Sequence, residues 1–196
     1  MPKIVDHDQR RQELAETTWR VIARRGLGGA TMRQIALEAG YANGALKPYF
    51  PTKDALLEAT YQHVFERSER RIEHALRGRR GLTALRALCL EILPVDDDLL
   101  DEARLVIAFW NGAAHDPEEA ALGTGALDRW RERILLALDQ AEDDGELRGG
   151  VDHERTAGLL LGQLFGSQVT AVVDPVGFSA ERLREHLEGL LELVRA

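Results

Sequence analysis

Hydroxyl, amide and cationic side chains cluster between residues 31 and 53 of the 196-residue chain. Side chains of these types can bind nucleic acid, because cations and hydroxyls hold phosphates while asparagine and alanine can contact adenine and thymine edges. A glycine among them lets N–H groups at a helix N-terminus approach a phosphate. The candidate phosphate-binding residues are Thr31, Lys47, Tyr49 and Lys53, the candidates for base edges are Asn43 and Ala45, the close-approach glycine is Gly44, and Arg33 can reach either kind of target.

The residues around these side chains predict a short helix, a tight turn and a second short helix. Thr31 is suited to cap the first helix, because its hydroxyl can accept a hydrogen bond from an orphan backbone N–H. Gly40 is expected to end that helix in the left-handed conformation. The second helix is expected to start near residues 43–44, with Leu46 and Phe50 as its apolar anchors. This arrangement is a helix-turn-helix, a unit that reads DNA.

Residues 31–50 resemble the helix-turn-helix of the TetR family of bacterial transcriptional regulators. The family pattern places a threonine, Ile-Ala and Ala-Gly pairs, a further glycine, a leucine, a Tyr-Phe pair and a lysine in fixed register. This chain supplies them without a gap as Thr31, Ile35, Ala36, Ala39, Gly40, Gly44, Leu46, Tyr49, Phe50 and Lys53. The chain departs from the pattern at Ala42, Lys47 and Pro48. Because proline removes one helix hydrogen bond, we expect a second helix of roughly one and a half turns.

Three other segments resemble the betaine-pathway, choline-responsive repressors of that family: the opening MPKIV, the arginines at 10–11 and the IAFW run that ends at Trp110. The resemblance implies a small-molecule pocket with apolar walls and a few polar groups. Trp110 is then suited to a cation–π contact with a quaternary ammonium group. The implied pocket residues are Phe65, Cys89, Phe109, Trp110, Asn111, His115 and Trp130. The alternative for Trp110, Trp130 and Cys89 is plain core packing.

Apolar residues recur at helical spacing along the chain, and no segment alternates as a β-strand does. The sequence therefore predicts an all-α fold of about nine helices. We expect a helix-turn-helix DNA-binding domain at residues 1–52 and a ligand-binding and dimerisation domain at residues 53–196. A long helix from about Lys53 to about Leu76 joins the two and is the natural lever for a signal. Other expected helices cover residues 7–25, 82–93, 99–114, 153–173 and 179–195, and one more opens at Asp116-Pro117 with Leu127, Trp130, Ile134, Ala137, Leu138 and Ala141 facing inward.

The last two predicted helices have more apolar surface than a monomer needs. Gly158, Gly162 and Gly166 make a flat ridge, whose cost of about 1 kcal/mol per glycine is tolerable where another helix approaches closely. The family resemblance implies that these helices pair with their twofold mates in a homodimer. The expected interface residues are Gly158, Gly162, Phe165, Gly166, Val169, Leu183, Leu187, Leu190 and Leu191. The two heads would then reach successive major grooves of a near-palindromic operator.

Charge is distributed unevenly along the chain. The formal net charge is −8, but residues 1–60 hold 9 Lys and Arg against 7 Asp and Glu, whereas residues 61–196 hold 16 against 26. This asymmetry favours a nucleic-acid-binding head on an acidic body. The apolar residues 156–173 are interrupted by polar ones, as in a buried helix, and a single cysteine suits a reducing compartment. We therefore expect a cytoplasmic protein with no secretion signal and no membrane span.

Catalytic patterns are missing from the sequence. No histidine follows a glutamate by three residues, which excludes a simple di-metal helical bundle, and no glycine-rich loop has P-loop or dinucleotide-binding spacing. We therefore expect no enzyme activity, no metal and no cofactor. The prediction is a homodimeric repressor that binds a double-stranded DNA operator and is released by an unidentified small-molecule effector. The alternative, which the acidic balance and Pro48 motivate, is a helical small-molecule-binding or enzymatic bundle with a vestigial DNA-binding head.

Overall fold

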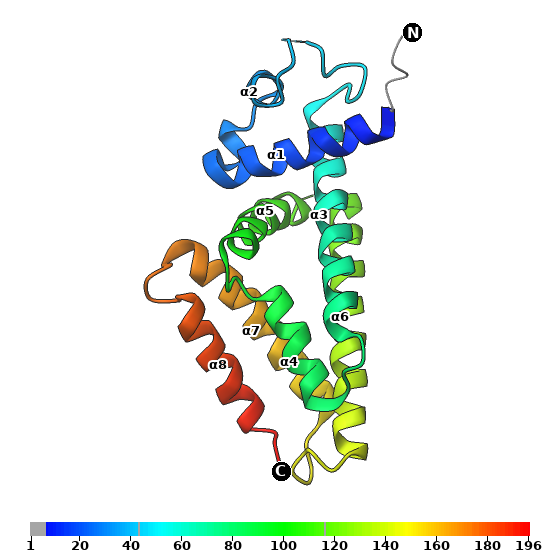
Figure 1. The fold of residues 1–196 in the computed structure, drawn as a ribbon, viewed down its shortest axis with the longest axis vertical. Coiled ribbons are helices and arrows are strands. Elements are labelled where there is room, and N and C mark those ends of the chain that lie inside the picture. Colours follow the sequence, from blue (N-terminus) through cyan, green and yellow to red (C-terminus); the bar gives the residue numbers. More distant parts are fainter. Residues whose placement is uncertain (1–6, 43, 116) are drawn as a thin grey trace.

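The computed structural model describes residues 7–42, 44–115 and 117–196, with side chains except at 118, 119 and 122. Within these ranges the chain forms eight α-helices and no β-strand, which confirms the all-α fold (Figure 1). The helices are α1 (His7–Gly29), α2 (Met32–Glu38), α3 (Lys53–Leu76), α4 (Gly81–Ile92), α5 (Asp97–Ala113), α6 (Pro117–Asp143), α7 (His153–Val173) and α8 (Ala180–Glu192). The difference from nine lies in the second helix of the predicted helix-turn-helix.

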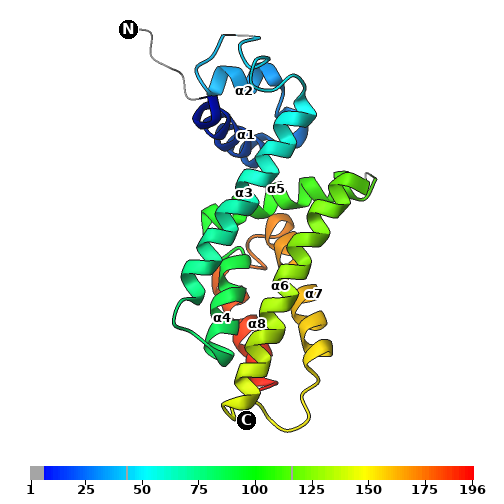
Figure 2. The same ribbon diagram turned by 90° about the vertical axis from the view of Figure 1, so that its right-hand side faces the viewer.

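The first two helices and the segment after them form a head at one end of the molecule (Figures 1 and 2). The expected end of the first helix coincides with a kink at Gly26, whose φ of 69° is not helical. Thr31 caps α2 as predicted, because its hydroxyl accepts a hydrogen bond from the N–H of Gln34 at 3.1 Å. Gly40 follows α2 with a φ of 74°. The head core includes the buried residues Leu14, Trp19, Ile22, Ile35, Leu46 and Phe50.

The body is built from α4 to α8, and α3 runs from the head into it (Figure 2). Thr52 caps α3 as its sequence position suggests, with its hydroxyl accepting the N–H of Ala55 at 3.1 Å. Below the head, α3 packs along α4, and α4 in turn packs against α6 and α8. The buried core of the body includes Leu85, Leu88, Ile134, Leu138, Leu164 and Leu187.

Helix α5 belongs to the body in sequence but packs into the head. Its residues Leu105 and Phe109 are buried in the same apolar cluster as Leu14 and Trp19 of α1. In Figure 1, α5 crosses directly beneath α1. The head is therefore held to the body through two helices, α3 and α5, rather than through α3 alone.

Helix α7 is, among the described residues, the one helix long and apolar enough to cross a membrane by length and composition. A single helix of this kind is weak evidence for a span, and α7 packs against α5 and α6 within the body. Its outward side carries exposed apolar residues, with Leu159 68% and Val173 77% exposed. Such a face suits contact with another protein surface.

Candidate nucleic-acid interface and small-molecule site

The segment between Gly44 and Phe50 forms consecutive turns, so the prediction of a short α-helix here is wrong. The N–H groups of Ala45 and Lys47 donate to carbonyls three residues earlier, at 3.0 and 3.3 Å, and that of Phe50 donates four residues back, at 2.8 Å. Gly44 has a φ of 87°, a left-handed conformation that a helix cannot contain. Pro48 has no N–H to donate. Together these two residues prevent a regular helix.

Buried anchors nevertheless fix the position of this segment. Leu46 and Phe50 are 1% and 0% exposed, as expected for its two apolar anchors. From α1, Arg11 donates a hydrogen bond to the backbone carbonyl of Tyr49. The Arg11 guanidinium also lies 4.3 Å from the centre of the Phe50 ring, a cation–π contact. The exposed atoms of the segment are therefore held in a defined place on the head.

The predicted phosphate-binding side chains differ in their freedom to reach DNA. Lys47 and Arg33 are exposed on the head, and Tyr49 is half-buried beside Tyr41, with ring centroids 6.3 Å apart. Lys53, in contrast, donates from Nζ to the carbonyl of Leu27 at 3.2 Å, so its ammonium group is held at the end of α1. The Lys53 side chain thus ties α3 to α1 in this structure.

Four candidates of the DNA-binding segment remain: Thr31, Asn43, Gly44 and Ala45. Thr31 is exposed, but its hydroxyl is engaged in the cap of α2. Ala45 is half-buried and Gly44 is exposed. Asn43 lies outside the described residues. Contact of these four residues with DNA stays a prediction.

An enclosed cavity of about 20 Å³ lies in the body between α3, α4, α5, α6 and α7. Phe65 and Trp130, two of the predicted pocket residues, line it. Phe65 also lines an open groove of about 490 Å³ between α3 and α6. The enclosed space has room for roughly one water molecule, so a larger ligand must move side chains to enter. The full lining is Val64, Phe65, Ser68, Glu91, Ile92, Leu99, Glu102, Val106, Trp130 and Gln168.

Polar groups on the cavity wall were missed by sequence reasoning. Gln168 is buried, its amide nitrogen donates to the carbonyl of Ile92 at 3.3 Å, and its oxygen has no partner. Glu102 is also buried, and its two oxygens accept hydrogen bonds from Arg71 at 2.7 and 2.9 Å. Glu91 accepts from the same arginine at 2.7 Å. Polar residues on otherwise apolar helical faces were the available signal for these three.

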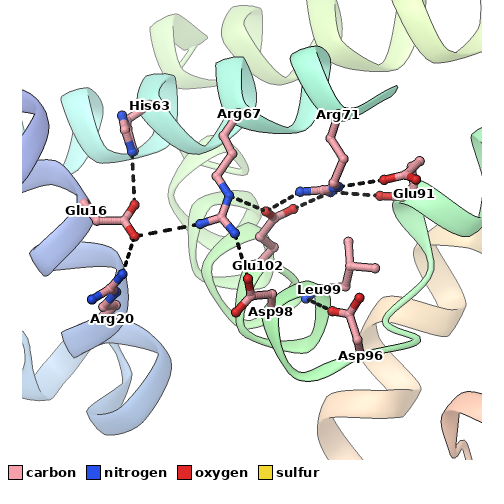
Figure 3. A network of polar contacts seen from close by, with 10 residues as sticks. All are labelled: Glu16, Arg20, His63, Arg67, Arg71, Glu91, Asp96, Asp98, Leu99 and Glu102. Carbon is pink, nitrogen blue, oxygen red and sulfur yellow. Dashed lines mark hydrogen bonds and ion pairs between the residues drawn. The ribbon is translucent and has the colours of Figure 1, made fainter. Parts of the chain in front are cut away.

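Arg71 stays charged in this setting for an electrostatic reason. Burial opposes its positive charge, but the hydrogen bonds and charges of Glu102 and Glu91 outweigh burial and raise the pKa of Arg71 above its ordinary value. Figure 3 shows Arg71 between the two carboxylates, one from α4 and one from α5. The pair of carboxylates is thereby satisfied inside the body.

The polar contacts continue from Arg71 into the head (Figure 3). One turn earlier on α3, Arg67 donates to Asp98 of α5 at 2.8 Å and lies 3.8 Å from both Glu102 and Glu16. Glu16 belongs to α1 in the head. The Arg67 guanidinium also lies 4.4 Å from the centre of a Trp19 ring. A continuous set of charged contacts thus joins the cavity wall to the head.

Aromatic rings form a second connection between head and body. Phe109 contacts Tyr61 and Trp110 edge-to-face, with ring centroids 4.7 and 5.5 Å apart. Trp110 contacts Phe165 of α7 at 5.5 Å, and Phe165 lies 6.0 Å from Trp130. Neither Phe109 nor Trp110 lines the enclosed cavity. Their surroundings therefore fit the packing alternative better than direct contact with a ligand in this cavity.

Three further predicted pocket residues also lie off the cavity wall. Cys89 is fully buried in the body core, and burial raises the pKa of its thiol to about 12, so it is a packing residue. Asn111 and His115 are exposed at the end of α5 and after it. A ligand contact by any of these three residues stays a prediction.

The predicted dimer residues separate into an outward and an inward set. Gly158, Gly162 and Gly166 are exposed on α7, with open space where a Cβ atom would stand, and Val169 is 47% exposed. Phe165 and Leu190 are half-buried. The inward set faces the core of its own subunit, because the apolar stripe of α8 is what holds this helix to the body; its members are Leu183, Leu187 and Leu191.

Family models match both parts of the chain. Residues 14–60 match the model of bacterial regulatory proteins of the tetR family. Residues 82–196, more than half of the chain, match the model of the BetI-type transcriptional repressor C-terminal domain. The first match covers the helix-turn-helix described above, and the second covers the cavity, α7 and α8.

Curated relatives carry the same assignment. The chain is 31% identical over 195 residues to the HTH-type transcriptional regulator PksA of Bacillus subtilis, a match that covers 97% of this chain and 94% of that protein. It is also 31% identical over 122 residues to the HTH-type transcriptional regulator BetI of Paraburkholderia phymatum, which covers 60% of this chain and 61% of that protein.

Solved structures have the same fold. A transcriptional regulator from Rhodococcus sp. Rha1 is 28% identical with a TM-score of 0.82, covering 94% of this chain and 95% of that chain. A regulator from Saccharomonospora viridis, solved in complex with choline, is 25% identical with a TM-score of 0.90, covering 96% of this chain and 99% of that chain. The chain therefore belongs to the TetR family of DNA-binding transcriptional regulators and carries a BetI-type C-terminal domain.

Proposed function

We propose that this regulator is a homodimeric repressor whose hold on its operator is released by a small organic cation. The observation that carries the proposal is the position of the cavity, whose wall residue Glu102 also contacts Arg67, the arginine that lies 3.8 Å from Glu16 of the head. A ligand that opens this cavity must move the helices that line it. It favours release only if it binds more tightly to the conformation that does not fit DNA.

The division of labour follows the chain. Residues 1–52 bind DNA, and residues 53–196 bind the effector and form the dimer. Lys47, Tyr49 and Arg33 contact phosphates or base edges from the exposed side of the head. Lys53 acts through the position of α1, since its ammonium group binds the carbonyl of Leu27. The work of the chain is regulation rather than catalysis, in line with relatives that are named transcriptional regulators.

The proposed effector class is a quaternary ammonium compound such as choline. The structural relative from Saccharomonospora viridis was solved with choline, and the C-terminal part matches the BetI-type model. The cavity wall adds a chemical reason, because the carboxylates of Glu91 and Glu102 and the unpaired oxygen of Gln168 are all acceptors. Acceptors beside the rings of Phe65 and Trp130 suit a cation that also carries a hydroxyl.

The dimer is proposed to form through the outward face of α7 with α8 beside it. The open glycine ridge lets two backbones approach closely, and the exposed Leu159 and Val169 supply apolar area around it. Twofold pairing would place two heads about 34–36 Å apart, one turn of DNA, on a near-palindromic site. Each head binds weakly alone, so both are needed for tight binding.

DNA affinity tests this function directly. Fluorescence anisotropy would be measured with labelled double-stranded DNA from upstream of the gene. The double variant Lys47→Ala plus Tyr49→Ala should lose affinity by about tenfold or more, because it removes phosphate contacts from both heads of the dimer. Arg77→Ala removes one exposed cation from the body and should leave affinity within about twofold.

The outcome also separates this proposal from its rival. The rival is a helical ligand-binding protein with a vestigial head, which the turns in place of a recognition helix would favour. A wild-type protein that binds choline but shows no DNA affinity at low salt would support the rival. Equal affinities of the wild type and the double variant would also contradict the assignment of Lys47 and Tyr49.

A further inference from the structure

Glu102 belongs both to the lining of the cavity and to the charged contacts that reach the head. Its carboxylate is the shared partner of Arg71, at 2.7 Å, and Arg67, at 3.8 Å. Arg67 in turn lies 3.8 Å from Glu16 of the head. Figure 3 shows Glu102 at the centre of this set, between the two arginines of α3. A change at Glu102 therefore alters both the lining of the cavity and the charged contacts that reach the head.

The charges around Glu102 allow it to exchange its arginine partners for another cation. Arg67 and Arg71 face three body carboxylates, those of Glu91, Asp98 and Glu102. These contacts leave one negative charge in excess. Each arginine also has a second carboxylate within 2.8 Å, Glu91 for Arg71 and Asp98 for Arg67. If Glu102 took a new partner, neither arginine would be left as an unpaired charge, which is the outcome that makes broken buried pairs costly.

The cavity cannot take a ligand without disturbing this arrangement. Its volume of about 20 Å³ is far below that of a small organic cation, so the wall must open. Gln168, from α7, lines the same cavity and has a buried side-chain oxygen without a hydrogen-bond partner. An entering cation with a hydroxyl group can thus use Glu102 for its charge and Gln168 for its hydroxyl. The helix that carries Glu102, α5, is the one that packs into the head core.

We propose that Glu102 is the residue that couples effector binding to DNA release. The effector cation pairs with the Glu102 carboxylate, Arg71 keeps Glu91 and Arg67 keeps Asp98, and the bond between α3 and α5 at Glu102 is broken. Arg67 then moves relative to Glu16 and Trp19, which shifts the head on the body. This inference rests on the proposed function. It adds one residue, Glu102, which binds the charged group of the effector and, by giving up its arginine partners, changes the contacts to the head.

Calorimetry without DNA tests whether Glu102 recognises the positive charge of the effector. Choline and its uncharged isostere 3,3-dimethyl-1-butanol would be titrated into wild type, Glu102→Gln and Asp101→Asn. Wild type should prefer choline by at least about tenfold, and Glu102→Gln should lose most of that preference, because a charge partner is removed while the side-chain shape is kept. Asp101→Asn is the matched control: it removes a carboxylate of the same helix that pairs with Arg104, lies outside the cavity wall and should keep the preference.

The coupling itself is tested with a second variant that leaves Glu102 in place. Arg67→Gln should still bind choline, but saturating choline should no longer weaken its DNA binding, since the contact to Glu16 is gone. An unchanged preference for choline in Glu102→Gln, or full choline-induced release in Arg67→Gln, would overturn the inference. A wild type that binds neither choline nor DNA would instead refute the proposed function, so the two failures can be told apart.

Discussion

At the scale of single residues, the cap of α2 makes a measurable contribution to the free energy of unfolding. The Thr31 hydroxyl accepts the N–H of Gln34, and its loss leaves that donor without a partner at the start of a helix of only seven residues. Thr31→Ala should lower the free energy of unfolding by about 1 kcal/mol, measured by urea denaturation. Thr17→Ala is the control, because its hydroxyl bonds a carbonyl within α1 and its loss should cost below about 0.5 kcal/mol. Equal losses in both variants would contradict the cap.

Cys89 predicts a dependence of stability on alkaline pH. Burial raises the pKa of its thiol from 9.0 to about 12, so above pH 9 the unfolded chain loses this proton while the folded chain keeps it. The contribution of the protonated thiol to stability is fully present below pH 9. As the pH rises from 9 toward 12, the free energy of unfolding falls by up to about 1.4 kcal/mol per pH unit. Cys89→Ala, whatever its cost at pH 7, should lose less stability between pH 8 and 10 than the wild type does. Parallel losses would contradict the raised pKa.

Local chemistry explains which residues could be predicted from the sequence. The Thr31 cap and the left-handed Gly40 depend on neighbours within a few positions, and both are confirmed. Glu102 depends on Arg71, which lies 31 positions away, and no local pattern encodes that distance. The same holds for Gln168 and Ile92, 76 positions apart. The sequence could therefore mark these polar residues on apolar helical faces, but it could not name their partners or bring them together at one cavity.

At the scale of elements, two glycines of α6 show how packing determines the effect of a substitution on stability. A Cβ atom on Gly123 would stand 2.6 Å from the ring of Trp110, whereas on Gly125 it would meet only the end of Arg129, at 3.5 Å. Gly123→Ala should therefore destabilise the protein by about 1–3 kcal/mol. Gly125→Ala should be neutral or stabilise it by up to about 1 kcal/mol, because alanine favours the helix. Thermal unfolding of both variants gives the comparison, and the same sign for both would contradict this packing.

The elements also separate what helical spacing can and cannot predict. Long amphipathic helices such as α3 and α8 follow from their apolar stripes, and their positions are confirmed. The second element of the helix-turn-helix is different: it keeps the glycine, leucine and Tyr-Phe pair of the family pattern, but Gly44 and the departure at Pro48 interrupt the helical hydrogen bonds. The insertion of α5 into the head core is also not encoded in spacing, because periodicity identifies an apolar face without naming its partner.

At the scale of the whole molecule, the glycine ridge of α7 predicts how subunits meet. Gly162 has open space beside it in the isolated chain, so Gly162→Arg should leave the subunit folded. In the proposed dimer the same side chain would separate two closely packed helices, and light scattering should find a monomer with weakened DNA binding. Glu132→Arg places arginine on the exposed side of α6 and should remain a dimer. A dimeric Gly162→Arg would contradict this interface.

The whole molecule also has two routes between cavity and head, the charged contacts through Arg67 and the aromatic contacts through Phe109. Both routes use α5 together with α3, through Glu102 and Arg67 in one and through Phe109 and Tyr61 in the other, so these two helices link the cavity to the head. The central claim is therefore that filling the cavity changes DNA affinity at a distance. Such coupling typically alters affinity by about 5- to 150-fold.

The most direct test is the affinity of the wild-type protein for its upstream DNA with and without saturating choline, measured by fluorescence anisotropy. Sodium chloride at equal concentration must serve as the control, because added salt alone weakens DNA binding. The account predicts tight binding in sodium chloride and a loss of affinity of at least about fivefold in choline chloride. Equal affinities in the two salts, with calorimetry showing that choline is bound, would contradict it.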